Sequence, residues 1–205
     1  CICDDEVCQA ASKQEIIRRY YAALNRMSAG EISEDEVFKI ELLMKQAHIT
    51  TDDRLVVAAA LKRAEETGGP AAAIELEDGE IITGKTSNLL GASAALLLNA
   101  LKHLANLDDD IHMISPEAIE PIQTLKTRYL GSKNPRLHTD EVLIALSISA
   151  ANDDIARLAL EQIPKLKGCQ VHTSVMLSSV DTKMFKKLGI QLTSESQKEN
   201  KKIYQ

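Results

Sequence analysis

The sequence has little of what a nucleic-acid surface needs. It contains no Trp, only 3% aromatic residues, and a formal net charge of -6 at pH 7. Bases stack on aromatic side chains, and the phosphate backbone is bound by clustered Lys and Arg. We therefore expect no nucleic acid among the main partners of this protein.

Long apolar runs and disulfide patterns are also missing. The most apolar stretch, from Leu89 to Leu101, is about half of the roughly 20 residues that a helix needs to cross a bilayer. No leader-like segment opens the chain, and four cysteines in 205 residues do not form a disulfide framework. These absences predict a cytoplasmic protein that makes no membrane contact.

The cysteines gather at the start of the chain. Cys1, Cys3 and Cys8 offer thiolates, but no Cys-x-x-Cys pair or nearby His completes a zinc site. Buried or incidental thiols are the favoured interpretation, and we expect no metal or other cofactor. Because the chain begins with Cys rather than Met, we expect native sequence upstream, so that a missing N-terminal domain of the same protein would be a partner.

Catalytic signatures are absent as well, which leaves open whether the protein is an enzyme. There is no H-E-x-x-H, no G-x-S-x-G and no Cys-x-x-Cys. Gly79 and Gly84-Lys85-Thr86 match a phosphate loop in letters, but a whole predicted strand separates the two glycines. His138, Cys169 and His172 match no zinc motif, and His172 is better explained as a packed, hydrogen-bonded histidine.

What the chain does contain indicates two lobes and a tail. Apolar residues recur at helical spacing in three segments that end near Met27, Ile49 and Gly68. We expect residues 1–69 to form a helical lobe of three helices, residues 70–194 to form an α/β domain, and residues 195–205 to be a polar, loosely attached tail. A homo-oligomer is the expected state.

The α/β domain is predicted to be organised around residues 71–104. Asp78-Gly79 favours a two-residue hairpin turn, and the following stretch from Leu89 to Leu101 is apolar all round, so it forms a central buried helix. A short strand is predicted at Ile111–Ile114. A second helix that is nearly apolar all round is predicted from Val142 to Ala151, and a strand, a helix and a strand follow between Gln170 and Ser194.

Two polar loops each precede one of the apolar helices. The first supplies Lys85, Thr86, Ser87 and Asn88, and the second supplies Lys133, Asn134, Arg136, His138, Thr139 and Asp140. Helix starts attract anions because their first backbone N–H groups have no partner within the helix. We therefore predict that the two loops bind one anion, with His138 or Asp140 as the candidates for proton transfer.

A plain capping role competes with this prediction. Thr86 or Ser87 would then begin the central helix with Lys85 in solvent, and Thr139 would begin the later helix with Asp140 and Glu141 in its first turn. Capping alone gives no reason for Arg136 and His138. A structural or oligomerisation module without catalytic activity is the alternative function that follows from capping.

Three long blocks resemble the C-terminal half of the uncharacterised bacterial family DUF1846 (UPF0371): EETGGPAAAIELEDGEIITGKTSNLLGASAALLLNALK, EAIEPIQTLK and LGSKNPRLHTDEVLIALSISA. The resemblance implies that this chain is a fragment of a longer protein. It also implies a helical lobe followed by a three-layer α/β/α domain with deaminase-like topology. Gly91-Ala92-Ser93 stands where such a deaminase has a zinc ligand, and no P-C-x-x-C follows, so zinc-dependent deamination is not expected.

Overall fold

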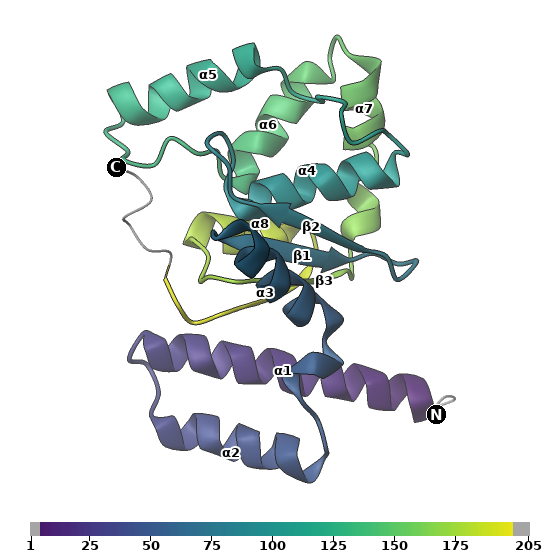
Figure 1. Cartoon of the computed structure of the whole chain (residues 1–205), viewed down its shortest axis with the longest axis vertical. Helices are drawn as coiled ribbons and strands as arrows, with labels where there is room; N and C mark the ends of the chain where they lie inside the picture. The colour runs from purple at the N-terminus through teal and green to yellow at the C-terminus, as the bar shows by residue number, and fades with distance from the viewer. Residues whose placement is uncertain (1–4, 199–205) are drawn as a thin grey trace.

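The computed structural model describes residues 5–198 as a mixed α/β protein with a four-stranded sheet (Figure 1). The strands are β1 (Ala71–Glu75), β2 (Ile81–Lys85), β3 (Gln170–Thr173) and β4 (Gln191–Ser194). Their order across the sheet is β2-β1-β3-β4, and β1 runs antiparallel to both of its neighbours. β3 and β4 are parallel, since helix α8 (Ser179–Lys187) carries the chain back between them.

Helices cover both faces of the sheet. In the register of the central strands, Ala73 lies opposite His172, and His172 lies opposite Thr193, so these side chains share one face. Helix α3 (Leu55–Thr67) packs on this face, with Val56 fully buried against it. The other face is more apolar and carries helices α4 (Ala92–Leu104) and α8.

Helix α4 lies unusually close to strand β2. A Cβ atom placed on Gly84 would come within 2.3 Å of the backbone nitrogen of Leu96 and 2.8 Å of the carbonyl oxygen of Ala92. No side chain fits there, so glycine is required for the packing of helix on strand. The G-K-T letters that resemble a phosphate loop therefore include a packing glycine at the end of a strand.

The remaining helices of the α/β part form an outer layer over α4 (Figure 1). They are α5 (Pro116–Thr124), the π-helix η2 (Leu125–Tyr129), α6 (Thr139–Ser149) and α7 (Asp154–Leu160). The 3-10 helix η3 (Ile163–Leu166) follows α7 and leads back to β3. Helix α6 is less buried than predicted, because Ile144 and Ile148 are 58% and 66% exposed. One side of α6 packs against α4, and the other side faces solvent.

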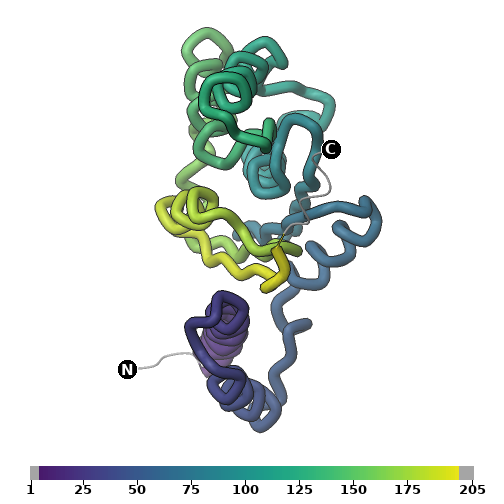
Figure 2. Tube along the Cα trace, turned by 90° about the vertical axis from the view of Figure 1, so that its left-hand side faces the viewer, coloured from purple at the N-terminus to yellow at the C-terminus, as the bar shows by residue number. Residues whose placement is uncertain are grey.

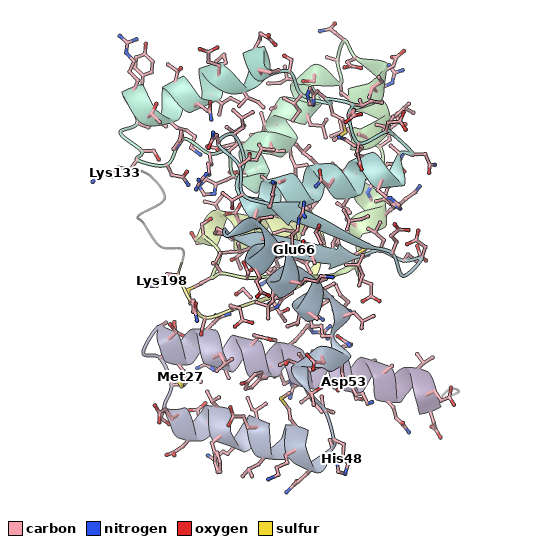
Figure 3. All side chains as sticks on the ribbon, in the orientation of Figure 1. Met27, His48, Asp53, Glu66, Lys133 and Lys198 are labelled. Carbon is pink, nitrogen blue, oxygen red and sulfur yellow. The ribbon has the colours of Figure 1, made fainter. Side chains whose placement is uncertain are left out.

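Helices α1 (Asp5–Ser28) and α2 (Glu34–Gln46) form an antiparallel pair on the α3 side of the sheet, followed by the short helix η1 (Thr51–Asp53). Figure 3 labels Met27 in the last turn of α1 and His48 just after the end of α2. α1 lies next to the sheet, where the ring of Tyr21 contacts His172 at 4.8 Å. α2 lies on the far side of α1, away from the sheet (Figure 2).

Arg54 ties the helical pair to the sheet. Its side chain is only 1% exposed and donates hydrogen bonds to Thr193 Oγ1 at 3.0 Å, the Gln191 carbonyl at 2.6 Å and the Val171 carbonyl at 3.1 Å. It also donates to the side chains of Gln14 in α1 and Gln170 in β3. Burial lowers the pKa of Arg54 to about 10. We call this group of residues the Arg54 cluster.

Two local predictions are wrong. The hairpin loop has three residues between Leu76 and Glu80 instead of two, and of these only Gly79 has a left-handed φ, of 84°. The segment 111–114 forms no strand, although Met113 and Ile114 are buried. The apolar residues there fill the core from a loop, because no sheet edge lies beside them to pair with.

The predicted division at residue 69 stays a prediction, although α3 packs on the sheet rather than within the helical pair. Of the predicted loose tail, Glu195 donates its backbone N–H to Thr173, and Gln197 accepts one from Met176 at 2.7 Å. Residues 199–205 lie outside the described part of the chain, as do Cys1 and Cys3. None of the helices within residues 5–198 is both long and apolar enough to span a membrane.

Candidate anion site at the start of helix α4

The two polar loops that precede α4 and α6 lie side by side. The Nε of Arg136 donates to the carbonyl of Ser87 at 2.7 Å. Leu89 and Leu137 are joined by a backbone hydrogen bond of 2.9 Å, and the N–H of Gly91 donates to the Leu137 carbonyl at 3.2 Å. The start of α4 is therefore held against the segment that leads into α6.

A cavity of about 100 Å³ opens where these segments meet. Its wall combines the first turn of α4, the loop before α6 and the segment from β3 to α8. The lining residues are Pro70, Thr86, Gly91, Ala92, Ser93, Ala94, Asn134, Arg136, Leu137, His138, Val175, Met176, Leu177, Ser178 and Asp181. This is the candidate functional site.

Ser93 is the group in this cavity that most clearly requires a partner. It is the second residue of α4, it is only 4% exposed, and its hydroxyl oxygen has no hydrogen-bond partner within residues 5–198. A buried hydroxyl without a partner costs about 1–3 kcal/mol. The cavity thus contains an unsatisfied donor beside the first backbone N–H groups of a helix.

Arg136 is fixed in place by its neighbours. Its side chain is 8% exposed, and its backbone N–H donates to the Asn134 side chain at 3.0 Å. Its carbonyl accepts from Lys126, which comes from the π-helix and also pairs with Glu141 at 2.7 Å. The guanidinium therefore lines the cavity from a loop that is anchored on two sides.

His138 and Asp181 form the second charged element of the cavity. The Nδ1 of His138 lies 3.0 Å from an oxygen of Asp181, which also accepts from Ser178 at 2.7 Å. The other oxygen of Asp181 accepts from the backbone N–H and the hydroxyl of Thr139, at 3.0 and 2.9 Å. We call these residues the Asp181 cluster.

The cluster fixes the charges of its members. Burial alone would raise the pKa of Asp181, but the hydrogen bonds from His138, Thr139 and Ser178 outweigh it and lower this pKa to about 2. The hydrogen bond to Asp181 raises the pKa of His138, against the opposing effect of burial. Asp181 is therefore ionised, and it fixes a proton on Nδ1 of His138, which leaves Nε2 as the titrating nitrogen.

Helix α6 begins differently from the competing prediction. Its N-cap is His138 rather than Thr139, and the backbone N–H of His138 donates to Glu141 at 2.8 Å, so the two form a capping box. Helix α4 is preceded by Gly91 as N-cap instead of Thr86 or Ser87. The Ser87 hydroxyl instead accepts from the backbone of Leu90 in the loop.

The residues predicted to bind the ligand, together with the proton-transfer candidate Asp140, divide into two groups. Those that line the cavity are Thr86, Asn134, Arg136 and His138. Those that do not line it are Lys85, Ser87, Asn88, Lys133, Thr139 and Asp140. The side chains of Lys85 and Lys133 are exposed, and Figure 3 shows Lys133 at the edge of the molecule. Thr139 is fully buried against Asp181, and Asp140 bonds to the backbone of Glu141.

Ser93, Ser178 and Asp181 belong to the cavity but were not predicted. In the sequence, Ser93 is a single polar residue within the apolar helix and gives no sign of a role in binding. Ser178 and Asp181 come from the start of α8. Asp181 lies 43 residues beyond His138 in the chain, and no local sequence pattern connects the two segments. The one local signal was the spacing of Ser178 and Asp181, because Ser is a common N-cap.

The other histidine and cysteine candidates lie elsewhere. His172 is fully buried, with Nδ1 2.9 Å from Thr193 Oγ1 and Nε2 3.3 Å from Glu195. Burial lowers its pKa. Cys8 is exposed and Cys169 is buried. In the described residues no three His, Cys, Asp or Glu side chains are grouped as a metal site would require.

Comparison with known proteins places the whole chain in one family. The C-terminal model of the domain of unknown function DUF1846 matches residues 52–204, and its N-terminal model matches residues 1–48. The chain is 57% identical over 204 residues to the UPF0371 protein cu0538 of Corynebacterium urealyticum and 46% identical over 203 residues to the UPF0371 protein SUB1165 of Streptococcus uberis.

These matches cover 100% and 99% of this chain but only 41% of each relative, so the chain spans less than half the length of these relatives. The two family models together extend over the helical pair as well as the α/β part. The chain belongs to the bacterial family DUF1846 (UPF0371), whose function is unknown.

Proposed function

We propose that the cavity at the start of α4 binds the phosphate or carboxylate group of a small ligand. The observation that carries this proposal is Ser93, a residue of the cavity lining whose buried hydroxyl has no partner in the described residues. The positive end of the α4 dipole lies at the same place. A ligand oxygen at this position would accept from Ser93 and from the first backbone N–H groups of the helix.

The charges around the cavity also favour an anion. Arg136 contributes a permanent positive charge, and His138 contributes another when it is protonated. Asp181 carries the opposing charge, but it already accepts four hydrogen bonds from Thr139, Ser178 and His138. With His138 neutral, the formal charges of Arg136 and Asp181 balance, and the cavity becomes positive as the pH falls through the raised pKa of His138.

The size of the cavity limits what enters it. Pockets for whole small molecules usually have volumes of roughly 300–1,000 Å³, so a cavity of about 100 Å³ suits one phosphate or carboxylate group rather than a whole nucleotide. The rest of the ligand would extend outward past Thr86 and Asn134. His138 would face the bound group with Nε2 and is the residue we propose for any proton transfer, with Asp181 as the residue that positions it.

Thermal unfolding in the presence of inorganic phosphate tests this function. We expect phosphate to raise the melting temperature of the wild-type chain more than chloride does at equal ionic strength. The Ser93→Ala change should remove most of that shift, whereas Lys85→Ala and Lys133→Ala should leave it unchanged, because both side chains lie outside the cavity. Repeating the measurement with acetate in place of phosphate shows whether the cavity binds a carboxylate group or a phosphate group.

The opposite pattern would reject the proposal. If phosphate and acetate fail to stabilise the wild-type chain, or if Ser93→Ala responds like the wild type while the exposed lysine variants lose the shift, the anion does not bind at α4. Ser93→Leu, which fills the cavity, provides an independent check because it should abolish binding by steric exclusion.

A further inference from the structure

Helix α2 carries an exposed apolar face that the chain itself does not cover. Phe38 is 57% exposed, Leu42 is 41% exposed and Leu43 is 49% exposed. Phe38 and Leu42 lie one turn apart on the same side of the helix, and Leu43 lies farther round, at the groove between α1 and α2. Large apolar side chains that cluster on a surface mark an interaction site more often than single exposed ones do.

A groove lies beside this face, between α1 and α2. It has a volume of about 570 Å³ and is lined by Ala11, Ser12, Glu15, Ile16, Arg19, Ile40 and Leu43. The floor is apolar, and the polar rim is neutralised internally, since Arg19 pairs with Glu15 at 2.8 Å. The groove thus offers an apolar channel along two helices without a net charge on its rim.

The packing of α2 explains why this surface needs a cover. α2 contacts mainly α1 and lies away from the sheet (Figure 1). Only Val37 and Met44 of its 13 residues are buried. Two helices on their own leave one side of their common apolar seam open, and a third helix closes it.

The family comparison indicates what would close it. The N-terminal family model ends at residue 48, so α1 and α2 belong to the domain whose model precedes the sheet-bearing part. The relatives are longer than this chain, which spans 41% of their length. The helical pair therefore corresponds to the end of the N-terminal domain in the family. The part of the relatives that this chain does not match could contain the segment that packs on the pair.

We propose that the groove between α1 and α2 binds an amphipathic helix from the N-terminal region of these longer proteins. The helix would present apolar residues at i, i+3 or i+4 and i+7 to Ile16, Ile40 and Leu43. A basic residue near one end would lie beside the acidic first turn of α2, which contains Glu34, Asp35 and Glu36. The helical pair then becomes a three-helix unit that joins the two domains.

The test uses this chain and the part of the Corynebacterium urealyticum relative that lies outside its matched 204 residues. We expect the two purified pieces to form a one-to-one complex, measured by calorimetry and light scattering. Phe38→Glu combined with Leu43→Glu should weaken the complex roughly tenfold or more, because the charge at position 43 then faces an apolar helix. Circular dichroism should show an unchanged fold, since both residues are largely exposed.

Ile148→Glu is the matched control, because Ile148 is 66% exposed but lies on α6, at the opposite end of the molecule from α2 (Figure 1). It should bind like the wild type. Equal weakening by the control, or no complex with the wild type, would overturn the proposal. A dimer of this chain that the α2 double variant abolishes would overturn the proposed occupant in favour of a second copy.

If the separate piece of the relative does not fold on its own, hydrogen exchange of the intact proteins provides the test. In the intact Corynebacterium relative, the amides that correspond to α2 should exchange more slowly than those of α2 in this chain. Equal exchange in the two proteins would show that nothing in the longer protein covers the groove.

Discussion

The Arg54 cluster and the Asp181 cluster are both built around a buried charge, yet they differ in what surrounds that charge. Arg54 donates to side chains and carbonyls from α1, β3 and β4, and it does not line the cavity at α4. Asp181 accepts four hydrogen bonds and lines that cavity, which also contains the unpartnered hydroxyl of Ser93.

The difference teaches that a buried charge does not by itself identify a functional site. Both charges are fully hydrogen-bonded and both have shifted pKa values, so neither burial nor titration separates the two clusters. The distinguishing feature is the lining of the cavity beside Asp181, in which the buried hydroxyl of Ser93 lacks a partner within residues 5–198. The Arg54 cluster is therefore structural, and the Asp181 cluster supports the proposed anion site.

The largest effect is expected in the Arg54 cluster. Arg54→Leu removes the hydrogen bonds that the guanidinium donates to the Gln191 and Val171 carbonyls and to the Thr193 side chain in the core. We expect the free energy of unfolding to fall by about 3–5 kcal/mol in urea denaturation. Arg157→Leu is the control, because Arg157 is an exposed partner of Asp154 and its loss should cost less than about 0.5 kcal/mol.

A smaller effect is expected for Asp181→Asn. Its pKa is lowered from 3.8 to about 2 in the folded state, so its stabilisation is present above pH 3.8 and is lost as the pH falls toward 2. We expect the variant to lose about 2 kcal/mol at neutral pH. Urea titrations at several pH values should show the difference from the wild type shrinking in that acidic window.

The same variant also probes His138. The pKa of His138 is raised above 6.5, so its stabilisation by Asp181 is present below pH 6.5 and is lost as the pH rises through the raised value. The stability difference should therefore decrease on the alkaline side as well. Asp154→Asn, at an exposed position, should show neither change. A difference that stays constant across pH would contradict the assigned charges.

The smallest effect on stability is expected for Ser93→Ala. Its hydroxyl makes no hydrogen bond in the described chain, so removing it should leave the free energy of unfolding unchanged or raise it by up to about 1 kcal/mol. Ser178→Ala is the matched serine control and should lower it by about 1 kcal/mol, because Ser178 caps α8 and donates to Asp181. Equal destabilisation by both changes would show that Ser93 is structural.

Several features of the fold follow from local patterns in the sequence. The amphipathic helices, the hairpin and the buried helix α4 each arise from neighbouring residues with a clear period or turn residue. The failed strand at residues 111–114 shows the limit of this reasoning. Its residues are buried as a strand's would be, but strand formation depends on a free sheet edge, which local sequence does not specify.

The candidate site shows the same limit more sharply. Arg136 and His138 were predicted as binding residues because helix capping alone gave no reason for an arginine and a histidine there. Both line the cavity. Asp181 could not be identified, because its role arises only when α8 packs beside the loop before α6. Ser93 gave no signal either, since a single serine in an apolar helix is ordinary until its lack of a partner is seen in three dimensions.

The close approach at Gly84 has a consequence for how the chain folds. Gly84 contacts the backbone of Leu96, only 12 positions further along, so β1, β2 and α4 form a continuous unit with short loops. Contacts that are local in sequence close with little loss of chain entropy and tend to form early. We expect this unit to be organised in the folding transition state, so that the start of α4 is fixed before β3 and α8 arrive to complete the cavity.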